Sequence, residues 1–199
     1  MQSKIHLANN ALMRIGNTRF IESLSSAQQE AIVINRLFDS VRVRLLRRMP
    51  WPFAKKVVTL SLTPYEAVDW KFVYRYPAQA LRVFKVFSNQ ARLPIEQEHP
   101  RPYEIQVING VQVIATNIAQ ARALIASDVE DTTEWDPLFE DAFIWALAVE
   151  IAVPLSGNNQ LIQLAIDSAN RAYDVARAAS LSERQESTLT LPEFVRARL

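Results

Sequence analysis

Prolines divide this sequence into three parts. Seven of the ten prolines lie between positions 50 and 102, so the two ends of the chain are almost free of this helix breaker. Proline lacks a backbone donor and clashes with the preceding helical turn, which excludes a long helix from the middle third. The ends carry apolar residues at helical spacing, whereas the middle carries them in alternation. We therefore expect helical ends and a β-rich middle.

Two helices are expected before the first proline. The first covers residues 3–15, with Ser3 as a possible cap and Gly16 just beyond its end. The second begins in residues 25–29, where a serine precedes a glutamine by three positions, the spacing of a capping box. An apolar residue at every third or fourth position predicts that this helix continues to Met49.

The middle of the chain has the two-residue period of β-strands. The segments "KVVTLSL", "KFVYRY", "LRVFKVF", "YEIQVI" and "VQVIA" are rich in β-branched and aromatic residues and are bounded by Pro, Asn and Gly. Asn109-Gly110 separates the last two segments, and this dipeptide is the strongest short signal for a hairpin. We expect a mainly antiparallel sheet.

Helical periodicity returns after the strands. Asp136 is placed to cap a helix that has Pro137 as its first residue and Glu140 as the partner in a capping box, and this helix should end near Pro154. After Gly157 the chain enters a further helix with a face of small residues, which suits close helix packing.

These elements predict an α+β protein in which a β-rich domain is inserted into a helical bundle. Residues 1–55 and 128–199 form the bundle, residues 56–127 form the inserted and mainly antiparallel domain, and residues 181–199 form an extended tail. The composition is that of a globular protein, with 49% hydrophobic and 22% charged residues. No stretch has the features of a secretory signal or a membrane span, so we expect no membrane association.

Charge and cysteine content limit the classes of function. A net charge of +1 gives no bulk attraction to nucleic acid or anionic lipid, so any charged surface must be local. A chain without cysteine has neither a thiolate nucleophile nor a zinc-thiolate site. Three glycines do not suffice for a loop that cradles phosphate, and no serine stands in a nucleophile elbow.

Candidate catalytic and metal-binding residues form no recognised motif. His6 and His99 lie far apart and lack partners at ligand spacing, so we favour structural roles for both. Asp128, Glu130 and Asp131 offer clustered carboxylates to a divalent cation, but the stretch lacks the glycine and the terminal glutamate of a calcium loop. We favour a solvated loop that leads into a helix N-terminus. No cofactor is expected.

Two features surround the first prolines. The rigid corner Pro50, Trp51, Pro52, Phe53 and Ala54 should bury Trp51 and Phe53 where helix meets sheet. The preceding helix carries a set of arginines: Arg36, Arg44, Arg47 and Arg48. The sequence leaves three roles open for this set, namely binding phosphates, pairing with a neighbouring chain and solvating the helix face.

The same corner resembles a known family, the tail tubular protein A or head-to-tail adaptor family of short-tailed bacteriophages. The similarity rests on "ANNALMRIGNTRFIESL", "LLRRMPWPFAKK" and "DWKFVYRYPAQALRV". The family pattern joins a small-residue helix ending in Ile-Gly or Leu-Gly, a Pro-Trp-x-Phe-Ala corner and a later strand; its positions are occupied here by Trp51, Phe53, Ala54, Trp70, Tyr76, Pro77, Leu81, Arg82 and Val83.

The resemblance implies a structural virion protein rather than an enzyme. Family members form a ring of twelve copies that joins the portal to the tail nozzle protein, tail tubular protein B, and encloses the channel through which genomic DNA passes without specific contacts. The chain would be made in the host cytoplasm and reside in the short tail at the portal vertex. Interfaces of this kind bury aromatic residues, for which Trp135 and Trp145 are candidates. The candidate contacts with other subunits, portal or DNA are Arg36, Arg44, Arg47, Arg48, Phe194, Arg196 and Arg198.

Three alternatives remain open from the sequence. One is a tail-associated hydrolase that uses Glu140 or Asp141, although two carboxylates carry no information by themselves. Another is a DNA-binding module that uses the arginine set. The third is a head-completion or adaptor protein of another type of phage.

Overall fold

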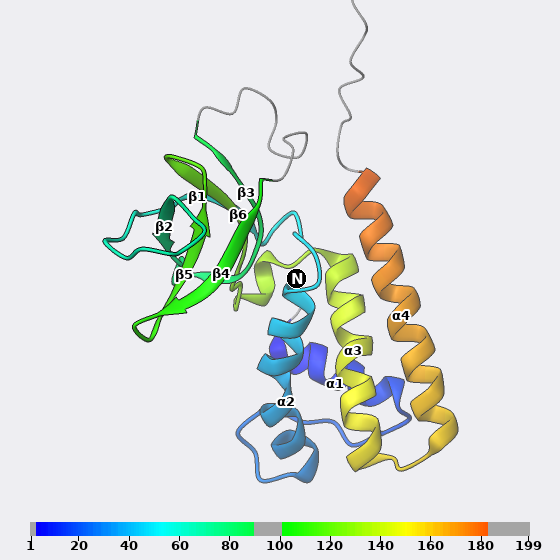
Figure 1. The fold of residues 1–199 in the computed structure, drawn as a ribbon. Coiled ribbons are helices and arrows are strands. Elements are labelled where there is room, and N and C mark those ends of the chain that lie inside the picture. The colour runs from blue at the N-terminus through cyan, green and yellow to red at the C-terminus, as the bar shows by residue number, and fades with distance from the viewer. Residues whose placement is uncertain (1–2, 90–100, 183–199) are drawn as a thin grey trace, which may run out of the picture.

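The fold is α+β, as the sequence predicts, with helices toward both ends of the chain and strands in the middle (Figure 1). The computed structural model describes residues 3–89 and 101–182. The first helix, α1 (Lys4–Arg14), begins and ends as expected. The Ser3 hydroxyl accepts a hydrogen bond from the His6 backbone N–H at 3.2 Å, and Gly16 adopts a φ of +72° just beyond the helix.

The second helix, α2 (Gln29–Leu46), is shorter at both ends than predicted. The expected capping box is wrong, because the Ser23 and Ser25 hydroxyls lie 2.8 Å apart in a local turn and no side chain caps the helix. Serine often bonds to its own neighbourhood in preference to a helix. The helix ends before Met49 because a residue that precedes a proline is disfavoured in the helical region.

The last two helices are α3 (Pro137–Leu155) and α4 (Asn159–Ser182). Asp136 caps α3 as predicted, accepting hydrogen bonds from the backbone N–H groups of Leu138 and Phe139 at 2.8 and 3.3 Å. Glu140 does not complete a capping box, since with Pro137 first it occupies the fourth helical position rather than the third. Its own N–H bonds to the Asp136 carbonyl at 2.9 Å.

In the described part of the chain, six strands form two antiparallel three-stranded sheets rather than one sheet. The first sheet has the order β1 (Lys55–Thr59), β6 (Ala121–Ser127), β3 (Ala80–Ser88), and the second has the order β2 (Phe72–Arg75), β5 (Val111–Thr116), β4 (Tyr103–Ile108). The alternating segments did not include β6, yet this strand is central in its sheet. The predicted hairpin is confirmed, because Ile108 pairs with Val111 across Asn109-Gly110.

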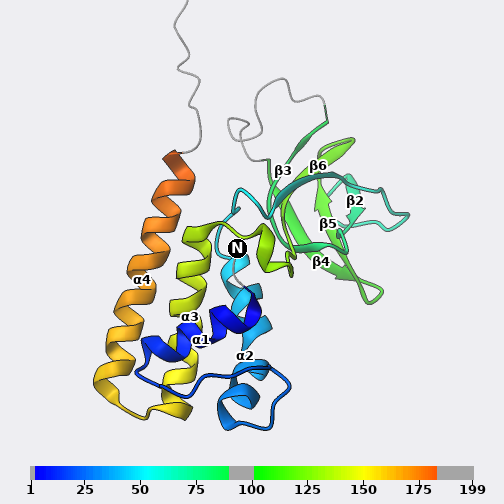
Figure 2. The same ribbon diagram turned by 180° about the vertical axis from the view of Figure 1, so that it is seen from behind.

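The described residues contain two hydrophobic cores. The larger core joins the helices, and the buried side of α3 contacts α1, α2 and α4. Figure 2, seen from behind, shows α1 crossing the bundle beside α2 and α3. The smaller core lies between the strands and includes Tyr74, Val86 and Ile125. Of the helices in the described part of the chain, none has both the length and the apolar character needed to cross a bilayer.

The hairpin turn gives a direct test of the β-rich part. Gly110 has a φ of +76° with open space around the position of a Cβ, so substitution is opposed by backbone conformation rather than by a clash. Gly110→Ala should cost about 1–2 kcal/mol of unfolding free energy. Gly110→Asn should cost less, because asparagine tolerates this conformation. Urea denaturation measures both, and equal losses would contradict this account of the turn.

Candidate interaction surface at the helix–sheet corner

Trp51 is the centre of the predicted corner. Its side chain is fully buried, and its indole N–H donates to the Leu45 carbonyl of α2 at 2.9 Å. Its ring meets Phe139 of α3 edge-on at 4.9 Å between centroids and Tyr173 of α4 at 6.1 Å. Edge-to-face aromatic pairs stabilise a fold beyond the burial of their area. One residue therefore ties together three helices.

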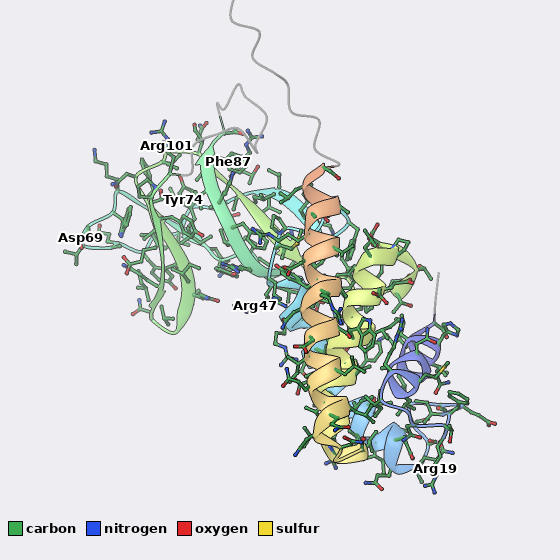
Figure 3. All side chains as sticks on the ribbon, turned by 90° about the vertical axis from the view of Figure 1, so that its right-hand side faces the viewer. Arg19, Arg47, Asp69, Tyr74, Phe87 and Arg101 are labelled. Carbon is green, nitrogen blue, oxygen red and sulfur yellow. The ribbon has the colours of Figure 1, made fainter. Side chains whose placement is uncertain are left out.

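The residues after Trp51 connect this joint to the sheet. The Ala54 carbonyl accepts two hydrogen bonds at 2.8 Å, from the N–H and the hydroxyl of Ser127 at the end of β6. The Arg82 guanidinium of β3 donates to the Arg47 carbonyl at 2.9 Å, just after α2. Figure 3 labels Arg47 in the region where the helices approach the strands. Polar bonds thus fix the position of the sheet on the bundle.

The corner prediction is confirmed in its main point. Trp51 and Ala54 are buried and Phe53 is half-buried, with its ring 4.9 Å from that of Phe139. Pro50 is half-buried and Pro52 is exposed.

The predicted arginines on α2 and just beyond it are all exposed, but their surroundings differ. Arg44 forms an ion pair with Glu150 of α3 at 2.6 Å. The Arg48 guanidinium lies 3.8 Å from the centroid of the Tyr173 ring. Arg36 forms no ion pair with any residue that the structure describes. Three further predicted contacts, Phe194, Arg196 and Arg198, lie outside the described residues.

Arg48 borders a cleft of about 420 Å³ between the corner, β3 and α4, which we call the basic cleft. Among the described residues, its charged lining is positive and comprises Arg48, Arg82, Lys85 and Arg177. Aromatic side chains support two of these cations, because the Arg82 guanidinium lies 5.0 Å from the Phe84 ring centroid and Arg48 covers Tyr173. A cation over an aromatic face is held in place without a carboxylate.

Arg82 also borders a second cleft, of about 430 Å³, together with Arg47 and two tyrosines. Burial raises the pKa of Tyr76, and the positive charges of Arg47 and Arg82 oppose that rise. Burial likewise raises the pKa of Tyr103, against the charge of Arg82. Both phenols therefore remain neutral near neutral pH and contribute hydrogen-bonding groups rather than charge.

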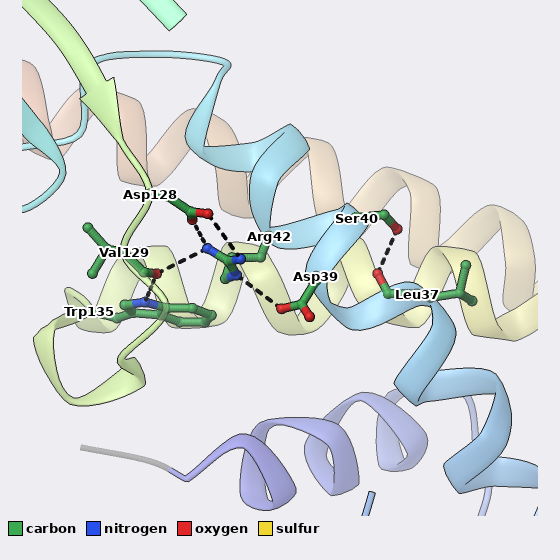
Figure 4. Close-up of polar contacts among 7 residues, drawn as sticks. All are labelled: Leu37, Asp39, Ser40, Arg42, Asp128, Val129 and Trp135. Atoms are coloured by element: carbon green, nitrogen blue, oxygen red, sulfur yellow. Dashed lines mark hydrogen bonds and ion pairs between the residues drawn. The ribbon is translucent and has the colours of Figure 1, made fainter. Parts of the chain in front are cut away.

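Arg42 is a buried charge that the sequence analysis missed. Its side chain is 3% exposed and bonds to Asp128, to Asp39 at 3.3 Å and to the Val129 carbonyl at 3.4 Å (Figure 4). Burial lowers the pKa of Arg42, but the hydrogen bond and charge of Asp128 together with Asp39 outweigh burial and keep this pKa above its ordinary value. The sequence could have indicated this burial, because Arg42 stands four residues after Phe38 and therefore on the apolar side of α2.

The acidic stretch before α3 acts as a loop, which we call the acidic loop and define as residues 128–134. Asp128 is engaged by Arg42, and Asp131 accepts bonds from the Thr133 N–H and hydroxyl at 2.9 and 2.8 Å. Those bonds from Thr133 lower the pKa of Asp131. Among the described residues there is no cluster of three acidic, histidine or cysteine side chains suited to a metal ion.

The other predicted candidates have partners inside the chain. Trp135 is a core residue rather than an interface residue, because it is 5% exposed and its indole N–H donates to the Val129 carbonyl at 3.2 Å. Trp145 is half-buried beneath the Arg14 guanidinium, which lies 4.5 Å from its ring centroid. Asp141, a candidate of the hydrolase alternative, forms an ion pair with Arg14 at 3.3 Å.

The remaining candidates are two histidines and one glutamate. His6 is exposed on α1, and His99 lies outside the described residues. Glu140 is 6% exposed near the start of α3. Comparison with protein-family models and with curated proteins finds no match to this chain.

The indole of Trp51 should dominate the stability of the corner. Trp51→Ala should lower the unfolding free energy by about 3–5 kcal/mol, since it empties a buried aromatic site. Trp51→Phe keeps most of the packing and loses the bond to Leu45, so its loss should be clearly smaller. Urea unfolding followed by circular dichroism measures both variants. A loss below about 1 kcal/mol for the alanine variant would show that the joint does not depend on this ring.

The pair Arg42–Asp128 should hold the acidic loop against α2. Asp128→Ala should cost about 2 kcal/mol, less than a fully buried pair, because the Asp128 side chain is 34% exposed and Asp39 remains. The double variant Arg42→Met/Asp128→Ala removes both charges and should recover much of that loss. Equal stability of the single and double variants would contradict the claim that an unpaired, buried Arg42 is what destabilises Asp128→Ala.

Proposed function

We propose that this chain is a head-to-tail adaptor of a short-tailed bacteriophage, a structural virion protein that acts through contacts with other protein chains. The proposal starts from the resemblance to the tail tubular protein A family. The residues that carry that resemblance at the corner are the ones that join bundle and sheet here, with Trp51 and Ala54 buried in the joint. This coincidence of motif and mechanical joint is the observation that carries the proposal.

A rigid joint suits an adaptor because ring closure depends on the angle between two docking surfaces. Subunits that meet head to tail close into a ring only when the rotation between their contacts is a fixed fraction of a turn. In this chain the corner fixes the orientation of the bundle relative to the strands through Trp51, Ala54 and Arg82. The ring is proposed to have twelve copies, as in the family.

The outer face of α4 supplies apolar surface for such contacts. Leu164 and Val175 are 50% and 57% exposed on α4, the outermost helix of the bundle (Figure 1). Exposed apolar side chains gathered on one element favour a protein partner. In the proposal, the partners are neighbouring copies, the portal protein and the tail nozzle protein.

The charge distribution agrees with a conduit for DNA. The net charge is +1, and Arg14, Arg42 and Arg44 are neutralised by carboxylates of the same chain. A channel lined with many unpaired arginines would release counterions from each phosphate it contacts and would hold a moving duplex strongly. We place the adaptor in the short tail at the portal vertex, where it encloses the genome exit channel without specific contacts to bases.

Reconstitution with the portal tests this function. Purified chain added to purified portal rings of the same phage should add one ring of density on the side away from the capsid, with an integral number of copies. Cryo-electron microscopy and native mass spectrometry measure the position and the number. Lys56→Glu, an exposed change on β1, is the folded control. Failure of the wild-type chain to bind portal rings under any salt condition would contradict the adaptor role.

A further inference from the structure

Three arginines of the basic cleft form no ion pair with a carboxylate of the described residues. The ion pairs of the described residues involve Arg14, Arg19, Arg42 and Arg44, and Arg48, Arg82 and Arg177 take part in none of them. Aromatic rings and the Arg47 carbonyl orient Arg48 and Arg82 instead. A guanidinium lying flat on a ring keeps the N–H groups at its edge available for a planar carboxylate.

The acidic loop presents the complementary charge. Glu130, Asp131 and Glu134 are exposed, and none of them forms an ion pair with a described residue. The loop is held at both ends, because Asp128 is bonded to Arg42 and the Trp135 indole donates to the Val129 carbonyl. A loop that is already ordered loses little conformational entropy when it binds a partner.

The acidic loop and the basic cleft lie on different faces of α2. Arg42, which anchors the acidic loop, is about 160° from Arg44 around the helix axis and about 120° from Arg48 if the helical rotation is continued. Arg44 and Arg48 line the surface toward α3 and α4. Among the described residues, no ion pair joins the acidic loop to the basic cleft.

We infer that the basic cleft of one copy receives the acidic loop of a second copy, with Arg48, Arg82 and Arg177 facing Glu130, Asp131 and Glu134. The contact joins two different surfaces, so each copy still has one free cleft and one free loop and the assembly propagates head to tail. This inference rests on the proposed adaptor ring and names its subunit contact. Nucleic acid is the weaker occupant, because a net charge of +1 provides no long-range attraction to a polyanion.

The absence of cysteine allows a clean crosslinking test. Thr133→Cys marks the acidic loop and Leu181→Cys marks the basic cleft, and neither removes a charge. A mixture of the two single variants, treated with a short bis-maleimide, should give a covalent dimer. Val68→Cys, which is fully exposed in the β-rich part, is the matched control. The double variant Thr133→Cys/Leu181→Cys should give a ladder of larger products, whereas each single variant alone should not.

Charge reversal tests the chemistry of the contact. Arg48→Glu/Arg177→Glu should lower the yield of crosslinked dimer about tenfold at low salt, since like charges then face each other. Glu130→Arg/Glu134→Arg on the loop partner should restore that yield when it is mixed with the reversed cleft. Raising the salt concentration should weaken the wild-type contact because exposed charges are screened. Circular dichroism confirms that each variant is folded.

A crosslink yield no higher than that of the Val68→Cys control would overturn the inference. So would a failure of Glu130→Arg/Glu134→Arg to restore the yield with the charge-reversed cleft. Binding of a fluorescent single-stranded oligonucleotide that depends on Arg48 and Arg177, without crosslinking between loop and cleft, would assign the cleft to nucleic acid and also overturn it. The two proposals fail separately. Portal binding without this crosslink leaves the adaptor role standing, and the crosslink without portal binding leaves the subunit contact standing.

Discussion

The burial of one indole determines how the two parts of this molecule are oriented. Trp51 follows α2 after a short turn, and its ring reaches α3 and α4 while its N–H is satisfied by a carbonyl of α2. Pro50 and Pro52 restrict the backbone on both sides of it, so the chain leaves the bundle in one direction. Ala54 then binds the end of β6 three residues later. The same joint borders the cleft between the corner, β3 and α4.

Local chemistry explains how much of the fold was predictable from the sequence. Asp136-Pro137 and Asn109-Gly110 act through bonds or dihedral angles within a few residues, and the structure confirms both. The strand β6 was missed because three alanines leave "ARALIAS" without the β-branched pattern of a strand. This strand is buried because it is central in its sheet. The start of α2 was wrong because the serines before it had a competing set of local bonds.

The sequence predicted which arginines of the candidate site are exposed, but it did not predict their tertiary contacts. The arginines Arg44 and Arg48 were expected on the surface and lie there, but the sequence did not indicate that one pairs with Glu150 and the other covers an aromatic ring. Arg42 was not among the arginines that the sequence analysis considered. Its partner Asp128 lies 86 residues away, and no spacing rule connects positions that far apart. Trp135 was named as an interface candidate because its packing against Phe38 of α2 is also a tertiary contact that the sequence does not indicate.

In the proposed adaptor ring, separated charges would let a nearly neutral chain bind its own kind without holding DNA. At physiological salt the field of a charge falls off over about 8 Å, so a duplex in a wide channel responds mainly to the net charge of the lining. In the proposed ring, a neighbouring subunit would approach to hydrogen-bond distance and respond to individual groups, such as Arg177 on one side and Glu134 on the other. The Arg42–Asp128 pair holds the acidic loop against α2. The same total charge would therefore allow both passage of a polyanion and attachment of a neighbour.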